Sequence, residues 1–173
     1  MTVRRNPRVL SSPTVYKNPW FEVIAKSGVD FDQPYYVLRT SDYVTVVPVT
    51  DAREVVFVKQ YRPALERYTT ELPSGHVETG EEPAAAALRE LLEETGYEAT
   101  SLAALGALHP DTGRMTNRLW SFVAKVRKVA QPEEGIELVL RPIESLVAGV
   151  CSGDLSNALD LAVLAKAAAG QHL

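Results

Sequence analysis

Three glutamates within one helical turn are the residues of this sequence best suited to chemistry. Glu90, Glu93 and Glu94 stand at positions i, i+3 and i+4, which places their carboxylates on one side of a helix. Like charges at this spacing repel by roughly 0.2–0.5 kcal/mol per pair. A hard divalent cation such as Mg²⁺ or Mn²⁺ would offset that repulsion, because these ions prefer oxygen ligands. A solvated acidic helix face is the alternative interpretation of the glutamates taken alone.

The residues around these glutamates predict the helix that must carry them. Pro83 suits a first helical turn, where its missing N–H costs nothing. Alanine and leucine, which are strong helix formers, occupy most of the next nine positions. Gly96 stands where a left-handed C-terminal cap is expected. We therefore predict a helix that begins at Pro83 and ends just before Gly96.

The whole segment from Gly75 to Tyr97 resembles the signature of the Nudix hydrolases. In that family the last position is usually a small aliphatic residue, and Tyr97 replaces it here at a position that packs in the core. The resemblance implies a hydrolase that requires Mg²⁺, with Mn²⁺ as a possible substitute. The glycines and charged residues that match the signature are Gly75, Glu81, Arg89, Glu90, Glu93, Glu94 and Gly96.

Shorter motifs at residues 18–20, 60–63, 71–75 and 156–159 resemble the ADP-ribose pyrophosphatase branch of this family. Members of that branch hydrolyse ADP-ribose to AMP and ribose 5-phosphate. The resemblance implies hydrolysis of the diphosphate of a nucleoside diphosphate sugar, with ADP-ribose the favoured substrate. The alternatives are other nucleotide sugars of the GDP-mannose type, dinucleoside polyphosphates, and a non-catalytic domain that senses ADP-ribose.

The resemblance also implies a role for each charged residue of the signature. Glu90 and Glu94 are expected to be the principal metal ligands, joined by the carbonyl of Ser74. Arg89 is expected to orient the carboxylates from outside the metal shell. Glu93, together with Glu81, would complete that shell or bind a second metal ion.

Four residues outside the signature are candidates for substrate binding. Arg62 could donate a forked pair of hydrogen bonds to a phosphate, although a surface salt bridge is an equal alternative. Glu71 could hold a ribose or base group, or could orient Arg62. Trp20 could stack on an adenine or pack in a core or interface. Arg114, or Arg118 in its place, could contact a phosphate or sugar.

The general base is expected in the loop that precedes the last strand. In the resembling branch this base is often a glutamate, and Glu133 and Glu134 occupy that loop. A solvated acidic loop is the alternative, in which case Glu93 is the next candidate. The branch often carries a proline a little further beyond the signature than Pro110, and the residues at 113–118 do not form the acidic loop expected after it.

Composition restricts the class of protein. A net charge of −4 without a basic stripe argues against binding to nucleic acid. Neither a secretory signal nor an apolar run of membrane-spanning length is found, so we expect no membrane partner. Cys151 is the sole cysteine, which excludes an internal disulfide and favours the cytoplasm. Its apolar surroundings predict a buried side chain.

The order of the predicted elements indicates an α+β chain with the Nudix fold, an α/β/α sandwich around a mixed β-sheet, and an extra pair of N-terminal strands. Residues 1–18 are expected to be a loosely ordered arm, so that residues 1–40 form a dimerisation region and residues 41–173 the Nudix hydrolase domain. Aromatic residues on the extra strands predict a homodimer. Strands are expected at 20–26, 34–40, 44–49, 54–60, 67–72, 99–108, 117–126 and 136–141, and further helices at 142–151 and 155–169.

Overall fold

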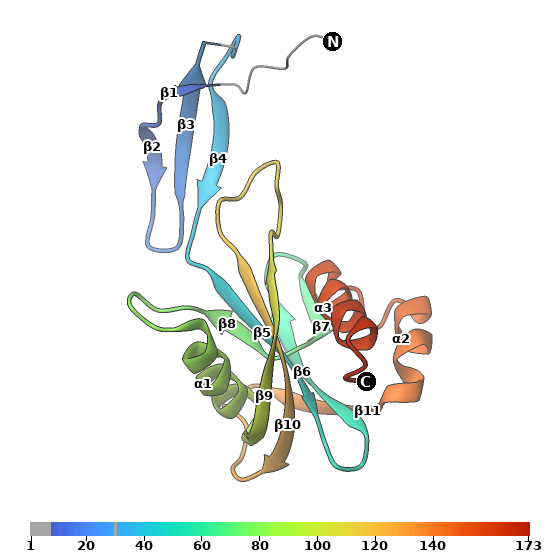
Figure 1. Ribbon diagram of the computed structural model, residues 1–173. Helices are drawn as coiled ribbons and strands as arrows, with labels where there is room; N and C mark the ends of the chain where they lie inside the picture. The colour runs from blue at the N-terminus through green and yellow to red at the C-terminus, as the bar shows by residue number, and fades with distance from the viewer. Residues whose placement is uncertain (1–7, 30) are drawn as a thin grey trace. The chain divides into compact units, whose positions relative to one another are not determined.

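The structure is a computed structural model that describes residues 8–29 and 31–173 (Figure 1). Contacts within the chain divide it into two compact units. The N-terminal unit comprises Met1–Asp42 and His109–Arg118, and the second unit comprises Tyr43–Leu108 and Leu119–Leu173. Within the described residues, no helix combines the length and apolar character needed to cross a bilayer.

The N-terminal unit is organised around one strand, β3 (Glu22–Gly28). The short strands β1 (Val9–Ser11) and β2 (Thr14–Lys17) pair with successive parts of β3, and β4 (Tyr35–Arg39) also pairs with it, all antiparallel. The segment His109–Arg118 belongs to this unit, because Leu38 donates its N–H to the Arg114 carbonyl (2.7 Å) and accepts one from Thr116 (3.1 Å).

The two predicted strands of this region are confirmed as β3 and β4, but the loosely ordered arm is wrong for residues 9–17. The first seven residues of that arm lie outside the described part of the chain. Strands β1 and β2 contain only three and four residues, which is too short for an alternating pattern to be recognised. Their stability comes from hydrogen bonds to β3, a partner that the local sequence does not reveal.

The second unit is a mixed seven-stranded sheet in the order β11-β6-β5-β10-β9, with β7 paired to β6 and β8 to β5. Strands β5 and β10 run parallel, and the other pairs are antiparallel. The strand bounds are Tyr43–Val49 for β5, Glu54–Arg62 for β6, Arg67–Glu71 for β7, Ser74–His76 for β8, Tyr97–Leu108 for β9, Leu119–Lys128 for β10 and Glu137–Pro142 for β11.

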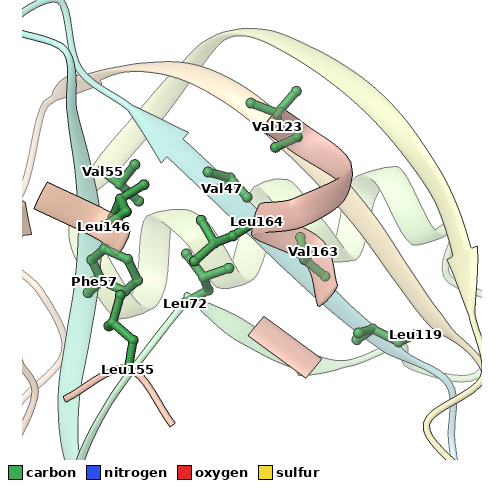
Figure 2. Close-up of a cluster of buried hydrophobic side chains, with 11 residues drawn as sticks. Val47, Val55, Phe57, Leu72, Leu119, Val123, Leu146, Leu155, Val163 and Leu164 are labelled. Atoms are coloured by element: carbon green, nitrogen blue, oxygen red, sulfur yellow. The ribbon is translucent and has the colours of Figure 1, made fainter. Parts of the chain in front are cut away.

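Alternating side chains of the central strands build a separate core on each face of this sheet. On one face, Val44, Val46 and Val56 pack with Ala87 and Leu91 of α1 (Pro83–Thr95). On the other face, an apolar cluster packs against α2 (Leu146–Ser152) and α3 (Ala158–Ala169), as Figure 2 shows. The predicted α/β/α sandwich around a mixed sheet is therefore confirmed. Residues of the second core include Val47, Phe57, Leu72, Leu119, Val163 and Leu164.

Helix α1 has the predicted limits, and Gly96 ends it in the left-handed conformation (φ 65°, ψ 19°) with its N–H bound to the Leu92 carbonyl. Backbone packs tightly against this glycine. A Cβ atom at Gly96 would lie 2.2 Å from the carbonyl oxygen of Ala130, and the Gly96 carbonyl accepts the N–H groups of Val129 and Ala130. The glycine thus fixes the loop after β10 to the end of α1.

The C-terminal helices differ in detail from the prediction. Residues Ile143–Ser145 form a 3₁₀ turn before α2, and α3 begins at Ala158 because the Asn157 side chain caps it by accepting the N–H groups of Leu159 and Asp160. The predicted burial of Cys151 is wrong, since its side chain is exposed. Helix α2 buries Leu146 and Gly149, and Cys151 projects from its other side.

Replacing Gly96 by alanine should destabilise the fold more than the same change at Gly153, which caps α2 in a similar conformation (φ 84°) and has open space where a Cβ atom would stand. Both changes incur the left-handed penalty of about 1–2 kcal/mol, but Gly96→Ala adds a clash with backbone. Urea unfolding should give the lower midpoint for Gly96→Ala. Equal midpoints would show that the Ala130 contact is unimportant.

Candidate functional site

The site lies where strands β5 and β6 separate. These neighbours pair directly only at Val49 and Val55. Further along, β7 pairs with β6 and β8 pairs with β5, so that both short strands fill the space between them. The chain must therefore cross from β6 to β5 between Glu71 and Ser74.

This crossing is attached to both helical layers. The N–H of Leu72 donates to Asp160 Oδ2 on α3 (2.9 Å), and the N–H of Ser74 donates to Glu94 Oε2 on α1 (2.9 Å). Between them, the Pro73 carbonyl accepts the N–H of Val46 (3.0 Å). Three consecutive residues thus connect the sheet to a carboxylate on each face.

Glu90 lies directly against the first glycine of the signature. A Cβ atom built on Gly75 would stand 2.0 Å from the Glu90 carboxyl carbon. A side chain at position 75 would therefore displace this carboxylate from its place beside the backbone of β8. The glycine matched by the signature has a steric reason in this structure.

Arg89 holds three of the acidic residues together. Its Nε and Nη2 atoms donate to the carboxylate of Glu81 (3.0 Å each), and Nη1 donates to Glu90 (2.7 Å) and Glu93 (3.3 Å). The hydrogen bonds to Glu81 and Glu90 raise the pKa of Arg89. The orienting function predicted for Arg89 has the contacts that it requires.

Glu94 is the carboxylate of α1 whose charge is least compensated. Burial, together with the charges of Glu90 and Glu133, raises the pKa of Glu94 to about 7. The N–H of Ser74 and the positive charge of Arg62 act in the opposite direction. A cation bound at Glu94 would favour its ionised form and reverse this shift.

Arg62 and Glu71 form a forked ion pair at the end of β6 and β7. Arg62 Nη2 lies 2.6 Å from Glu71 Oε2, and Nε lies within 3.2 Å of both oxygens. Burial alone would raise the pKa of Glu71, but hydrogen bonds from Arg62 and Thr69 outweigh it and lower the pKa. In this state Arg62 is engaged by Glu71.

A cleft of about 330 Å³ opens beside these groups, and the residues that line it without having been predicted as site residues include Asn157 and Asp160. Asn157 caps α3, and its side chain also helps to lower the pKa of Glu71. Asp160 is 5% exposed, and burial raises its pKa to about 7. A single acidic residue between Leu159 and Leu161 on an apolar helix was the available signal. The cleft is lined by Tyr43, Thr45, Arg62, Glu71, Ser74, Gly75, His76, Leu119, Asn157, Leu159 and Asp160.

The two base candidates differ in their relation to α1. The backbone N–H of Glu133 donates to the carbonyl of Glu93 (3.0 Å), and the charge of Glu133 acts on Glu94. Glu134 is exposed in the same loop and has neither of these links among the described contacts. Glu93 itself is half exposed and bound to Arg89.

The two other substrate candidates belong to the N-terminal unit. Trp20 is 73% exposed and donates its backbone N–H to Asn18 Oδ1. The guanidinium of Arg114 lies 5.3 Å from the centre of the Tyr35 ring. Both residues thus belong to the N-terminal unit, whereas Arg62 and Glu71 line the cleft of the second unit.

The residues of the second unit fit a divalent cation without forming a ready-made cage. Among the described residues, no three acidic, histidine or cysteine side chains converge closely enough to hold an ion by themselves. Mg²⁺ does not need such a cage, because it is usually bound through one or two carboxylates, water and substrate phosphates. Glu90 and Glu94 provide two partly or largely buried carboxylates beside the same backbone strand.

Comparison with known proteins agrees with this arrangement. The chain is 39% identical over 101 residues to the ADP-ribose pyrophosphatase of Bacillus subtilis, a match that covers 58% of this chain and 55% of that protein. It is 38% identical over 89 residues to the methanol dehydrogenase activator of Bacillus methanolicus, covering 51% and 48% of the two chains. The chain thus spans about half the length of the curated relatives it matches.

The fold extends over nearly the whole chain in a solved structure described as an ADP compounds hydrolase. The two structures share a TM-score of 0.82 at 21% identity, over 97% of this chain and 95% of the other. The family model for the NUDIX domain matches residues 40–146. The family predicted from the segment Gly75–Tyr97 is confirmed: this chain belongs to the NUDIX domain family.

Proposed function

We propose that this chain is a metal-dependent hydrolase that cleaves the diphosphate of a nucleoside diphosphate sugar, with ADP-ribose giving AMP and ribose 5-phosphate. The observation that carries the proposal is Glu94, a largely buried carboxylate beside Glu90 whose pKa is raised to about 7. The similarity to an ADP-ribose pyrophosphatase supports the choice of substrate. As the family generally uses a divalent metal, we propose Mg²⁺, with Mn²⁺ as a substitute.

Glu90 and Glu94, with the carbonyl of Ser74, would hold the ion, and Glu93 would contribute to its shell. When bound, the ion would neutralise phosphate oxygens and lower the pKa of a coordinated water. Arg89 keeps Glu81, Glu90 and Glu93 in place through its hydrogen bonds. A phosphate that entered the cleft could recruit Arg62 from its pair with Glu71, which would leave Glu71 free to accept hydrogen bonds from a sugar.

Hydrolysis adds water across one P–O bond of the diphosphate. The water oxygen bonds to phosphorus, the bridging oxygen leaves with the other phosphate, and one water proton must be removed. We propose that the Glu133 carboxylate accepts this proton, since its loop is joined to Glu93 and its charge reaches Glu94.

The single cysteine of the chain also supports a cytoplasmic location for the protein.

A panel of diphosphates tests the proposed reaction. In Mg²⁺, ADP-ribose should show the highest kcat/KM when compared with GDP-mannose and a dinucleoside polyphosphate, measured as phosphate released after phosphatase coupling. Glu94→Gln should lower turnover by more than about 100-fold, because even residues behind metal ligands contribute 10–100-fold. A preference for another substrate would select that alternative, and Glu94→Gln turnover near that of the unchanged protein would contradict the metal assignment.

The two loop glutamates provide a matched pair for testing the base. Glu133→Gln should lower kcat by about 10²–10⁴-fold, the usual contribution of general base catalysis, with little change in KM. Glu134→Gln removes the same charge from the same loop and should have a much smaller effect. Steady-state rates across a pH series measure both. A larger loss in Glu134→Gln would transfer the role to Glu134.

We also propose that the protein is a homodimer formed through the region 1–40. The described part of this region exposes Trp20 together with Val15, Tyr16 and Tyr36. Exposed apolar and aromatic side chains are unfavourable on a monomer, and two-fold dimers, the most frequent oligomers, are one way to bury them. In a dimer, Trp20 and Arg114 of one subunit could complete the substrate site of the other.

Light scattering at micromolar concentration should therefore give about twice the chain mass of 19.0 kDa. Trp20→Ala should raise KM for ADP-ribose more than it lowers kcat, because it removes substrate binding without touching the metal residues. Val129→Ala, an exposed apolar residue of the second unit, serves as the control. A monomeric mass would overturn the dimer, and an unchanged KM would leave Trp20 as packing alone.

A further inference from the structure

Asp160 is a buried carboxylate that the proposed reaction does not use. It lies in the first turn of α3, a helix built mainly from alanine, leucine and valine. Its side chain is 5% exposed, and ionisable groups seldom occupy such positions without a specific partner. The charged groups that act on it are Glu71 and Arg62, both at the cleft.

The partner of Asp160 is a backbone group of the crossing segment. Strand β7 ends at Glu71, where it pairs with Val58, so the next N–H, that of Leu72, has left the ladder. Leu72 is fully buried, and its N–H donates to Asp160 Oδ2 at 2.9 Å. Without this acceptor a buried amide would lose its hydrogen bond.

The same segment then reaches the acidic cluster within two residues. The Ser74 hydroxyl donates to the Leu72 carbonyl (3.1 Å), and the Ser74 N–H donates to Glu94 Oε2 (2.9 Å). Pro73 stands between them and restricts the backbone. Because this piece of chain is short and restricted by Pro73, a change in the backbone of Leu72 would move Ser74 and its hydrogen bond to Glu94.

We propose that Asp160 is a positioning residue for the metal site. By accepting the N–H of Leu72, it holds the crossing so that Ser74 meets Glu94 at the edge of β8. The role requires a hydrogen-bond acceptor at this position and no contact between Asp160 and substrate. The inference rests on the proposed function, because it assumes that Glu94 and Ser74 bind the metal.

Substitution at Asp160 separates this role from simple packing. Asp160→Ala removes the acceptor and should weaken Mn²⁺ binding about 10–100-fold, as expected for a residue behind metal ligands. Binding of Mn²⁺ alone can be measured by electron paramagnetic resonance of the free ion. Asp160→Asn keeps an acceptor oxygen for the Leu72 N–H and should bind Mn²⁺ nearly as well as the unchanged protein.

A matched control is available on the same helix. Val163 is fully buried in the core beneath α3, so Val163→Ala loosens the helix without removing the Leu72 bond. Val163→Ala should leave Mn²⁺ affinity unchanged when all variants are measured well below their melting temperatures.

Asp160→Ala should also lower kcat for ADP-ribose at subsaturating metal while KM for ADP-ribose stays close to its original value.

Three results would overturn the assignment. Equal Mn²⁺ affinities in Asp160→Ala and Val163→Ala would reduce Asp160 to a packing residue. A loss in Asp160→Asn as large as that in Asp160→Ala would exclude the acceptor role, and a raised KM would indicate direct contact with substrate. Failure of the proposed function would give a different result. The unchanged protein would then hydrolyse none of the diphosphates, whatever its affinity for Mn²⁺.

Discussion

The hydrogen bond from the Ser74 N–H to Glu94 is the interaction on which the site depends. A carboxylate that is largely buried needs partners, and Glu94 has one backbone donor close by and a more distant arginine charge. That donor is available because β5 and β6 separate and leave room for the chain to cross between them. The separation of β5 and β6 thus makes room for Ser74, and α1 provides the Glu94 carboxylate that accepts its N–H.

Two arginines form ion pairs with different carboxylates of this site. Arg89 serves the acidic residues of α1 and the preceding loop, whereas Arg62 is paired with Glu71 on the neighbouring strands. Neither makes a direct hydrogen bond to Glu94 among the described contacts. The carboxylates of the site therefore outnumber the arginines that contact them, and this excess of negative charge supports the metal ion proposed above.

Local patterns predicted the limits of α1 correctly, because Pro83 and Gly96 each act within a few residues. The same reasoning failed where long-range contacts decide the outcome. Strands β1 and β2 exist through β3, and β8 exists through β5. Asp160 escaped notice since its partner is 88 residues away. The proposed preference for Glu133 over Glu134 rests on the bond from its N–H to the Glu93 carbonyl, which no pattern in that loop reveals.

The two bonds of the crossing segment span very different lengths of chain, 20 residues for Ser74 and Glu94 against 88 for Leu72 and Asp160. Loop-closure entropy grows only with the logarithm of length, so the longer closure costs about 1.3 kcal/mol more in a flexible chain. A carboxylate from the far end of the chain can thus join the site at a small thermodynamic cost. The distance between such partners has its larger effect on the folding rate, because the chain must bring remote segments together before they stabilise one another.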